Sequence, residues 1–232
     1  MLPKKNALQH IVHALQADKN LNLAPPSSLS GLARKATRLH FKKGDYIFKS
    51  EEQSTRFYLV ENGQVIMSKE SLSGKSFTYL MATRGFTLNA ITCFKLGTYM
   101  FSARAIDEVS IISIPSADFR NWVLCNPEVC NGILSTMGDL LNGAYTRIID
   151  LVDESAEKRI SNVLCMLSTR IGLKLSLTNS DIAEMAGTSR ETAARTISRL
   201  QESGTISKSR GSIHILDKEQ LDQITSSPFF II

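Results

Sequence analysis

Residues 178–197 contain two short helical patterns that meet at Gly187, and no other part of the chain constrains the fold as strongly. Gly187 can adopt the left-handed conformation that ends a helix, and polar residues suited to N-caps precede each pattern. The candidate N-caps are Thr178 or Ser180 for the first helix and Thr188 or Ser189 for the second. We therefore expect two helices joined by a tight turn.

The second helix has one small apolar side and one polar side. At about 100° per residue, Ala193, Ile197 and Leu200 fall together on the apolar side. The opposite side carries hydrogen-bond donors, acceptors and positive charge. A helix with such a face, braced by another, is suited to enter the major groove of double-stranded DNA and read base edges. The same spacing also fits an ordinary amphipathic helix pair with a solvated charged face.

Residues 189–195 read S-R-E-T-A-A-R and closely resemble the S-R-E-T-x-x-R recognition helix of the Crp/Fnr superfamily of bacterial transcription regulators. The resemblance extends along almost the whole chain. It implies that Arg190 and Arg195 donate to guanine and that Glu191 accepts from cytosine, in a half-site like TGTGA. The DNA-binding residues expected on the helix are Thr188, Ser189, Arg190, Glu191, Thr192, Arg195 and Arg199.

Residues 206–216 are predicted to form a β-hairpin wing with its turn at 209–212. Lys208 and Arg210 are expected to contact phosphates, which would position the domain without reading sequence. Solvated turn charges are an equally simple interpretation of both residues.

Short apolar or alternating runs separated by turn residues fill residues 38–115, as in a β sandwich or barrel. Asn62-Gly63 stands between two such runs and predicts a hairpin. This stretch resembles the cyclic-nucleotide-binding β-roll, including the pieces at 44–48 and 60–65.

The period changes after Pro115. Residues 116–124 read as a short helix, and Asn126 followed by Pro127 is a good start for a longer one. The apolar positions that follow repeat every three or four residues, as in the seam of a coiled coil. This dimer seam comprises Cys130, Leu134, Met137, Leu141, Ala144, Ile148 and Leu151. A second apolar face, expected to pack against the β domain, comprises Ile133, Leu140, Ile149 and Val152. One buried core helix also fits the pattern.

These segments predict an α+β protein: a β-roll sensor domain at 1–125, a dimerisation helix and hinge at 126–155, and a winged helix-turn-helix at 156–232. The resemblance implies a homodimer whose two recognition helices lie about 34 Å apart over inverted half-sites. It also implies RNA polymerase as a partner and activation more often than repression.

Composition excludes some classes of protein. The 27 Lys and Arg against 22 Asp and Glu permit nucleic-acid binding without requiring it. No apolar run approaches the ~18 residues of a membrane span, and Met1–Lys5 is not followed by a secretory apolar region. We therefore expect a cytoplasmic protein with no membrane partner. The sequence contains no Gly-rich phosphate loop, paired metal-ligand motif or nucleophile elbow, so we expect no enzyme.

The expected effector segment departs from cyclic-nucleotide binders. Asn89-Ala90-Ile91 stands where their G-E-L glutamate segment would lie, and Tyr99-Met100 or Met100-Phe101 replaces the phosphate-binding Arg-Ser. A buried cyclic phosphate needs a charge partner or several donors, and Arg104 is displaced from the required position. We therefore expect a signal other than cyclic AMP. The candidate effector-pocket residues are Phe86, Leu88, Asn89, Ala90, Ile91, Tyr99, Met100, Phe101, Ala144 and Tyr145.

Other signals remain open at this point. Cys93 is the earliest cysteine, so no N-terminal iron–sulfur cluster is expected. Cys125 and Cys130 flank the start of the central helix and could have a redox role, or Cys130 could be a buried free thiol. His10 and His13 lie one helical turn apart and could ligate haem, or they could be surface histidines. The apolar pocket lining equally suits haem, a small apolar ligand or a collapsed core. A ligand-independent interaction module is the alternative class of function.

Overall fold

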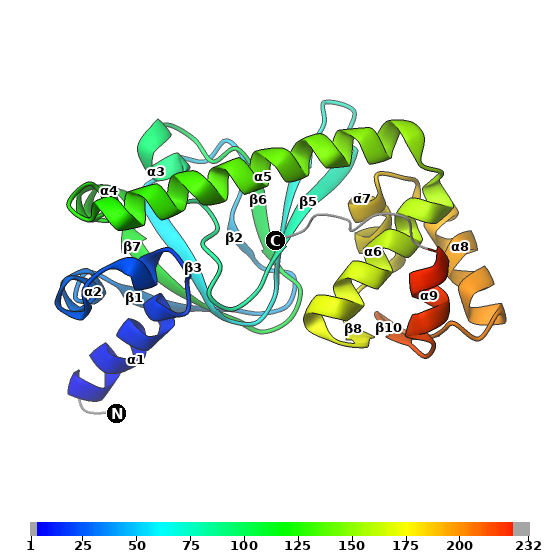
Figure 1. Cartoon of the computed structure of the whole chain (residues 1–232), viewed down its shortest axis with the longest axis horizontal. Coiled ribbons are helices and arrows are strands. Elements are labelled where there is room, and N and C mark those ends of the chain that lie inside the picture. Colours follow the sequence, from blue (N-terminus) through cyan, green and yellow to red (C-terminus); the bar gives the residue numbers. More distant parts are fainter. Residues whose placement is uncertain (1–3, 225–232) are drawn as a thin grey trace. The chain divides into compact units, whose positions relative to one another are not determined.

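The computed structural model describes residues 4–224 and confirms the mixed α+β class (Figure 1). The chain divides into two compact units. One combines residues up to Lys69 with Leu80–Asp139, and the other combines Glu70–Tyr79 with the residues from Leu140 onward. Within residues 4–224, no helix is long and apolar enough to cross a membrane. The domain boundaries at 125 and 155 remain a prediction.

Residues 37–115 form two antiparallel sheets. The first has the order β1-β7-β3, with strands at Thr37–Phe41, Val109–Pro115 and Arg56–Asn62. The second has the order β2-β6-β4-β5, with strands at Tyr46–Phe48, Ser102–Ala105, Val65–Glu70 and Ser76–Ala82. The predicted series of short strands is therefore present.

The predicted hairpin at Asn62-Gly63 is wrong. Strand β3 pairs with β7, whereas β4 pairs with β6, so the chain crosses here from one sheet to the other. Gly63 has a φ of 90°, and a Cβ there would lie 2.5 Å from the carbonyl oxygen of Glu108. The next amide, of Gln64, donates to the Asp107 carboxylate at 2.8 Å. The local turn residues are correct, but close packing against the 107–109 loop decides which strands pair.

Helices cover the β1-β7-β3 sheet in the first unit (Figure 1). Phe57 of β3 stacks on Phe119, with ring centroids 3.7 Å apart, and both side chains are fully buried. Val129 and Ile133 belong to the same core cluster. The helical segments are α1 (Lys4–Gln16), η1 (Leu21–Leu23), α2 (Pro26–Ala33), α3 (Thr92–Lys95) and α4 (Ser116–Leu124).

The long helix α5 runs from Pro127 to Asp153, beginning at the predicted proline. Helix α6 (Ala156–Ile171) follows, and the Ser155 hydroxyl caps it by accepting from the amide of Lys158. The break between the two helices lies within the expected hinge. The second apolar face of α5 is only partly as predicted. Ile133 is buried, but Ile149 and Val152 are 59% and 78% exposed, so their predicted packing against the β domain is wrong.

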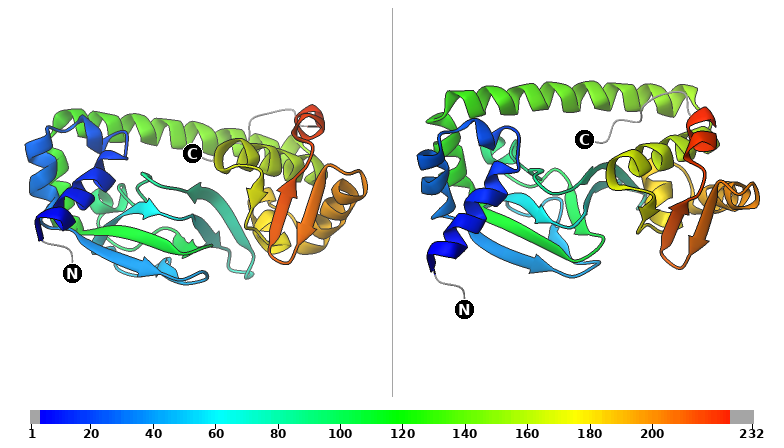
Figure 2. Two further views of the ribbon diagram at one scale, coloured as in Figure 1. Left: turned by 90° about the horizontal axis from the view of Figure 1, so that it is seen from below. Right: turned by 60° about the horizontal axis from the view of Figure 1, so that its bottom comes forward.

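The second unit continues with a compact set of helices and a three-stranded sheet of order β8-β10-β9. Helices α6, α7 and α8 contact one another, and β9 contacts α8 (Figure 2). The elements are β8 (Lys174–Leu175), α7 (Asn179–Ala186), α8 (Arg190–Glu202), β9 (Ile206–Ser209), β10 (Ser212–Ile215) and α9 (Lys218–Ile224). Strands β9 and β10 form the predicted wing.

Candidate nucleic-acid interface

The turn between α7 and α8 is set by local capping. Thr178 accepts from the amide of Asp181, and the Asp181 carboxylate accepts in return from the Thr178 amide at 2.8 Å, which completes a capping box. Gly187 has φ 58° and ψ 46°, the left-handed conformation expected of it. Ser189 caps α8 by accepting from the Thr192 amide. Of the alternatives in the sequence, Thr178 and Ser189 are thus the caps.

Arg159 of α6 holds this turn from outside. Its guanidinium donates to the carbonyls of Ala186 and Gly187 at 2.8 and 3.2 Å, and to the Glu154 carbonyl at 2.6 Å. A Cβ on Gly187 would lie 2.7 Å from the end of the Leu151 side chain of α5. Hydrogen bonds from Arg159 of α6 therefore hold the turn between α7 and α8 in place.

The two sides of α8 separate as predicted. Ala193, Ile197 and Leu200 are buried, and Thr196 joins them. Arg190, Glu191 and Arg195 are exposed. Because no core packing depends on those three side chains, they can reach an external ligand without disturbing the fold. Among the other residues predicted to contact DNA, Thr188 and Thr192 are half-buried. The exposed ones are Ser189, Arg199, Lys208 and Arg210.

Glu191 is held as a carboxylate. Its own amide, at the start of α8, and the Ser189 side chain hydrogen-bond the carboxylate and lower its pKa below the usual value near 4.5. It can therefore accept a hydrogen bond from an amino group at neutral pH. Arg195 donates to the Thr192 hydroxyl at 3.4 Å. Arg199 instead forms an exposed ion pair with Glu157 at 3.0 Å, so one predicted DNA contact already has a partner within the protein.

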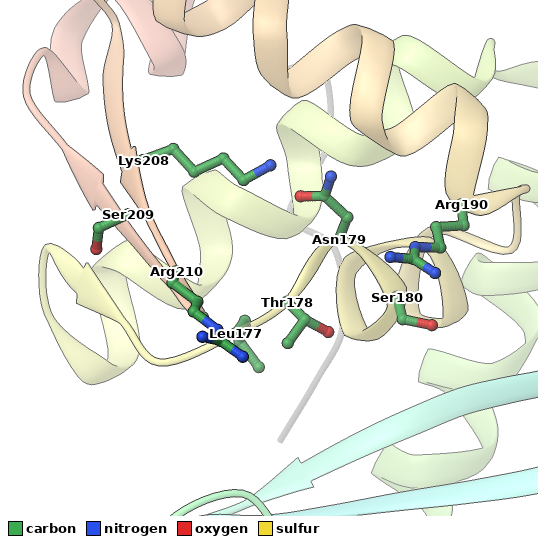
Figure 3. Close-up of a pocket in the computed structure, with 9 residues that line it drawn as sticks. Leu177, Thr178, Asn179, Ser180, Arg190, Lys208, Ser209 and Arg210 are labelled. Atoms are coloured by element: carbon green, nitrogen blue, oxygen red, sulfur yellow. The ribbon is translucent and has the colours of Figure 1, made fainter.

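A cleft of about 560 Å³ opens between the start of α7, the start of α8 and the wing. Figure 3 shows Lys208 extending from the wing towards Asn179, while Arg190 lies beside Ser180. Three cations therefore line this cleft: Arg190, Lys208 and Arg210. All three are among the residues expected to contact DNA.

Thr178, Asn179 and Ser180 line the same cleft and were not predicted as contacts. Asn179 is notable because its buried side-chain oxygen has no hydrogen-bond partner among the residues that the structure describes. A buried unpaired polar atom is costly unless a ligand or water satisfies it. The run of three polar residues at the start of α7 could have indicated this role, since helix N-termini bind phosphate groups.

The predicted seam residues lie along α5 with different exposures. Leu134, Leu141 and Ile148 are each more than half exposed, and Leu151 is 38% exposed. Ala144 is also exposed. Cys130 and Met137, by contrast, are half-buried against the core cluster of the first unit.

The expected effector residues are used internally. The Asn89 amide donates to the Arg56 carbonyl at 2.7 Å and its oxygen accepts from the Tyr58 amide at 2.9 Å. Tyr99 stacks on Phe48, with ring centroids 4.1 Å apart, and burial raises the pKa of its phenol to about 12. The other residues are buried at Leu88, half-buried at Phe86, Ala90, Ile91, Met100 and Phe101, and exposed at Ala144 and Tyr145 of the second unit.

His10 and His13 do not fit a haem site. They line a pocket that also contains Arg38, Glu61 and Arg84, rather than the apolar walls expected around haem. The Nε2 atom of His13 lies 3.2 Å from a guanidinium nitrogen of Arg84. Among residues 4–224, no group of three His, Cys, Asp or Glu side chains is placed to hold a metal ion. We derive no function through haem.

Comparison with known proteins gives two family matches. Residues 38–124 match the cyclic nucleotide-binding domain, and residues 158–224 match the Crp-like helix-turn-helix domain. The "CRP-like cAMP-activated global transcriptional regulator" of Mycobacterium tuberculosis is 24% identical over 204 residues, covering 84% of this chain and 91% of that protein. The "Nitrogen fixation regulation protein FixK" of Bradyrhizobium diazoefficiens is 25% identical over 198 residues, covering 82% of each.

A solved structure of a putative Crp/Fnr-family regulator from Eubacterium rectale shares the fold, with a TM-score of 0.73 and 21% identity over 91% of this chain and 100% of that one. The two family matches fall on the β domain and on the helix-turn-helix, which are the two parts that the sequence predicted. The chain belongs to the Crp/Fnr family of transcription regulators, with a cyclic-nucleotide-binding-type domain and a helix-turn-helix DNA-binding domain.

Proposed function

We propose that the protein is a homodimeric regulator that reads an inverted TGTGA-like site through α8. The observation that carries this proposal is the exposed set of Arg190, Glu191 and Arg195 on a helix whose other side is buried. Paired arginines match the acceptors on guanine, and an ionised glutamate matches the amino group of cytosine. A solvated charged face needs no such combination at these three positions.

Phosphate contacts would orient α8 in the groove. Lys208 and Arg210 of the wing face the same cleft as Thr178, Asn179 and Ser180 at the start of α7. Cations and polar side chains in one hollow suit a DNA backbone phosphate, and such contacts set register rather than sequence. The unpaired Asn179 oxygen would then accept from a water that bridges to the DNA.

The exposed seam of α5 supports a dimer. Leu134, Leu141 and Ile148 present large apolar side chains to solvent at heptad spacing. Pairing with the same face of a second copy would bury them and place two recognition helices over inverted half-sites. RNA polymerase remains a predicted partner, and activation remains the expected mode.

The signal is proposed to differ from cyclic AMP. The Asn89 amide and the Tyr99 hydroxyl both bond to the backbone carbonyl of Arg56, so neither is available to a ribose or a cyclic phosphate. The tuberculosis relative is described as cAMP-activated, but the residues at these positions here do not supply that anchor.

A DNA-binding assay with matched duplexes tests the proposal. We expect full-length protein to protect TGTGA-N6-TCACA in preference to a duplex with scrambled half-sites, and a duplex with one half-site to bind more weakly. Arg195→Ala should remove the preference for the TGTGA half-sites. Arg170→Ala removes an equal charge from an exposed position on α6 and should retain that preference. Cyclic AMP should change none of these affinities.

Equal binding to all three duplexes would overturn the sequence-specific reading. Absence of binding to every duplex would favour the alternative, a ligand-independent interaction module. The dimer is tested separately by measuring the mass of Leu141→Glu by sedimentation. This variant should be monomeric, and a mass equal to that of the unchanged protein would contradict the proposed seam.

A further inference from the structure

A polar pocket of about 370 Å³ lies in the first unit between α1 and the β1-β7-β3 sheet, far in sequence from the helix-turn-helix. This volume falls within the range of small-molecule sites. Its charged and titratable lining comprises His10, His13, Arg38, His40, Glu61 and Arg84. Neither the β-roll position of a cyclic nucleotide nor the DNA interface uses these six residues.

The sheet register builds the floor of the pocket. His40 of β1 and Asn62 of β3 both stand opposite Ser110 of β7, so three polar residues form one row across three strands. The Ser110 hydroxyl lies 3.0 Å from Nδ1 of His40, which fixes the imidazole. Regular backbone pairing therefore positions this part of the pocket.

A close backbone contact positions Arg84. The following residue, Gly85, has a φ of 83°, and a Cβ there would lie 2.4 Å from the carbonyl oxygen of Ala17, just beyond the end of α1. The Gly85 amide also donates to the carbonyl of Val60 at 2.8 Å. The loop that carries Arg84 is thus fixed between α1 and β3, which brings its guanidinium to His13.

The charges in the pocket favour an anion. Arg38 forms an ion pair with Glu61, so these two charges balance. Arg84 has a neutral partner instead, since the His13 nitrogen that faces its guanidinium must accept the hydrogen bond. One positive charge in the pocket, that of Arg84, is therefore unbalanced.

We propose that this pocket binds a small multivalent anion, either an organic phosphate or a polycarboxylate, with Arg84 as the main contact. A guanidinium binds carboxylate and phosphate oxygens through paired hydrogen bonds. His10, His13 and His40 line the same pocket and offer ring nitrogens as further hydrogen-bond partners. Arg38 and Glu61 are the other charged groups facing the ligand, and β7 contributes the uncharged Ser110.

The ligand would also join separate parts of the unit. His10 and His13 come from α1, His40 from β1 and Arg84 from the loop after β5, so one anion would hold α1 against the sheet. A ligand that binds only this arrangement stabilises it by mass action. The site therefore offers a way for the first unit to respond to a metabolite without a cyclic nucleotide.

Titration calorimetry on the full-length protein tests the proposal, with inorganic pyrophosphate and citrate as probes at constant pH and ionic strength. We expect saturable binding of at least one probe. The two probes separate a phosphate site from a carboxylate site. Arg84→Gln should weaken binding tenfold or more.

A matched variant separates this pocket from other positive surfaces. Arg34→Gln removes the same charge at the exposed end of α2, outside the pocket, and should bind normally.

The proposal is overturned if neither probe binds saturably, or if Arg84→Gln binds like the unchanged protein. Equal weakening in Arg34→Gln would also overturn it, because the effect would then follow from net charge. Thermal unfolding of each variant without a probe shows whether a loss of binding accompanies a loss of fold. If Arg84→Gln is unfolded, Arg84→Lys replaces it: this variant keeps the charge, loses the paired hydrogen bonds and should also weaken binding.

Discussion

The DNA-facing side of α8 and the segment at 86–101 use their polar side chains in opposite ways. Arg190 and Arg195 are exposed and are not part of the core. Asn89 is buried, and its side chain hydrogen-bonds to two backbone groups of β3. Side chains on an exposed face remain available to an external ligand because they form no hydrogen bonds or contacts that the core requires. A buried segment can keep the same fold while its polar groups form hydrogen bonds within the protein instead of with a ligand.

Arg190→Ala should produce the largest difference between these regions. Loss of a bidentate contact to guanine costs about 1–3 kcal/mol per half-site, hence about 2–6 kcal/mol for a dimer on its palindrome. Competition binding against duplexes altered at the contacted guanine measures the effect, and the free energy of unfolding should not change because Arg190 is exposed. Uniform weakening on every duplex would instead make Arg190 a phosphate contact.

Asn89→Ala should have the opposite profile. It leaves the Tyr58 amide without its side-chain partner, whereas the Arg56 carbonyl keeps the Tyr99 hydroxyl, and one unpaired buried group costs about 1–3 kcal/mol. We expect urea unfolding to show a loss of about 1–3 kcal/mol, with DNA affinity of the folded protein unchanged. Unaltered stability combined with altered DNA binding would assign Asn89 to signal transmission rather than to structure.

Thr178→Ala tests the local frame of the DNA interface. Removing the hydroxyl breaks the capping box and should lower the free energy of unfolding by about 1 kcal/mol. Thr169→Ala, on the exposed side of α6, is a matched control that should stay within about 0.5 kcal/mol of the parent. Equal effects of both changes would mean that the cap contributes nothing specific.

These contrasts explain how far the sequence alone could reach. The caps at Thr178 and Ser189, the left-handed Gly187 and the start of α5 at Pro127 depend on neighbours a few residues away, and all were predictable. The partner strands of β3 and β4 depend on a contact between Gly63 and residue 108, which no local pattern contains.

The site divides in the same way. The three base-reading candidates stand in one short motif, so their common face follows from helical periodicity. Asn179 and Ser180 enter the interface only because the wing folds back beside α7. Arg84 and His13 are 71 positions apart, and their contact depends on the close approach of Gly85 to Ala17. Sequence spacing does not report contacts of that kind.

The smallest predicted effect concerns pH at the DNA-facing side of α8. The pKa of Glu191 is lowered, so its ionised form is favoured in the folded protein, and any stability from it is present above the ordinary value near 4.5 and lost only as pH falls through the lowered pKa. DNA discrimination at the cytosine should therefore be constant between pH 6 and 8.

Binding measured at pH 6, 7 and 8 on duplexes with and without that cytosine checks this expectation, with Glu191→Gln as the comparison. Glu191→Gln should lower discrimination equally at all three values, because the glutamate it replaces is fully ionised throughout. A discrimination that falls towards pH 6 would show that the carboxylate protonates in the DNA complex. The DNA-facing side of α8 would then not keep its chemistry unchanged, and its contrast with the internally bonded segment at 86–101 would fail.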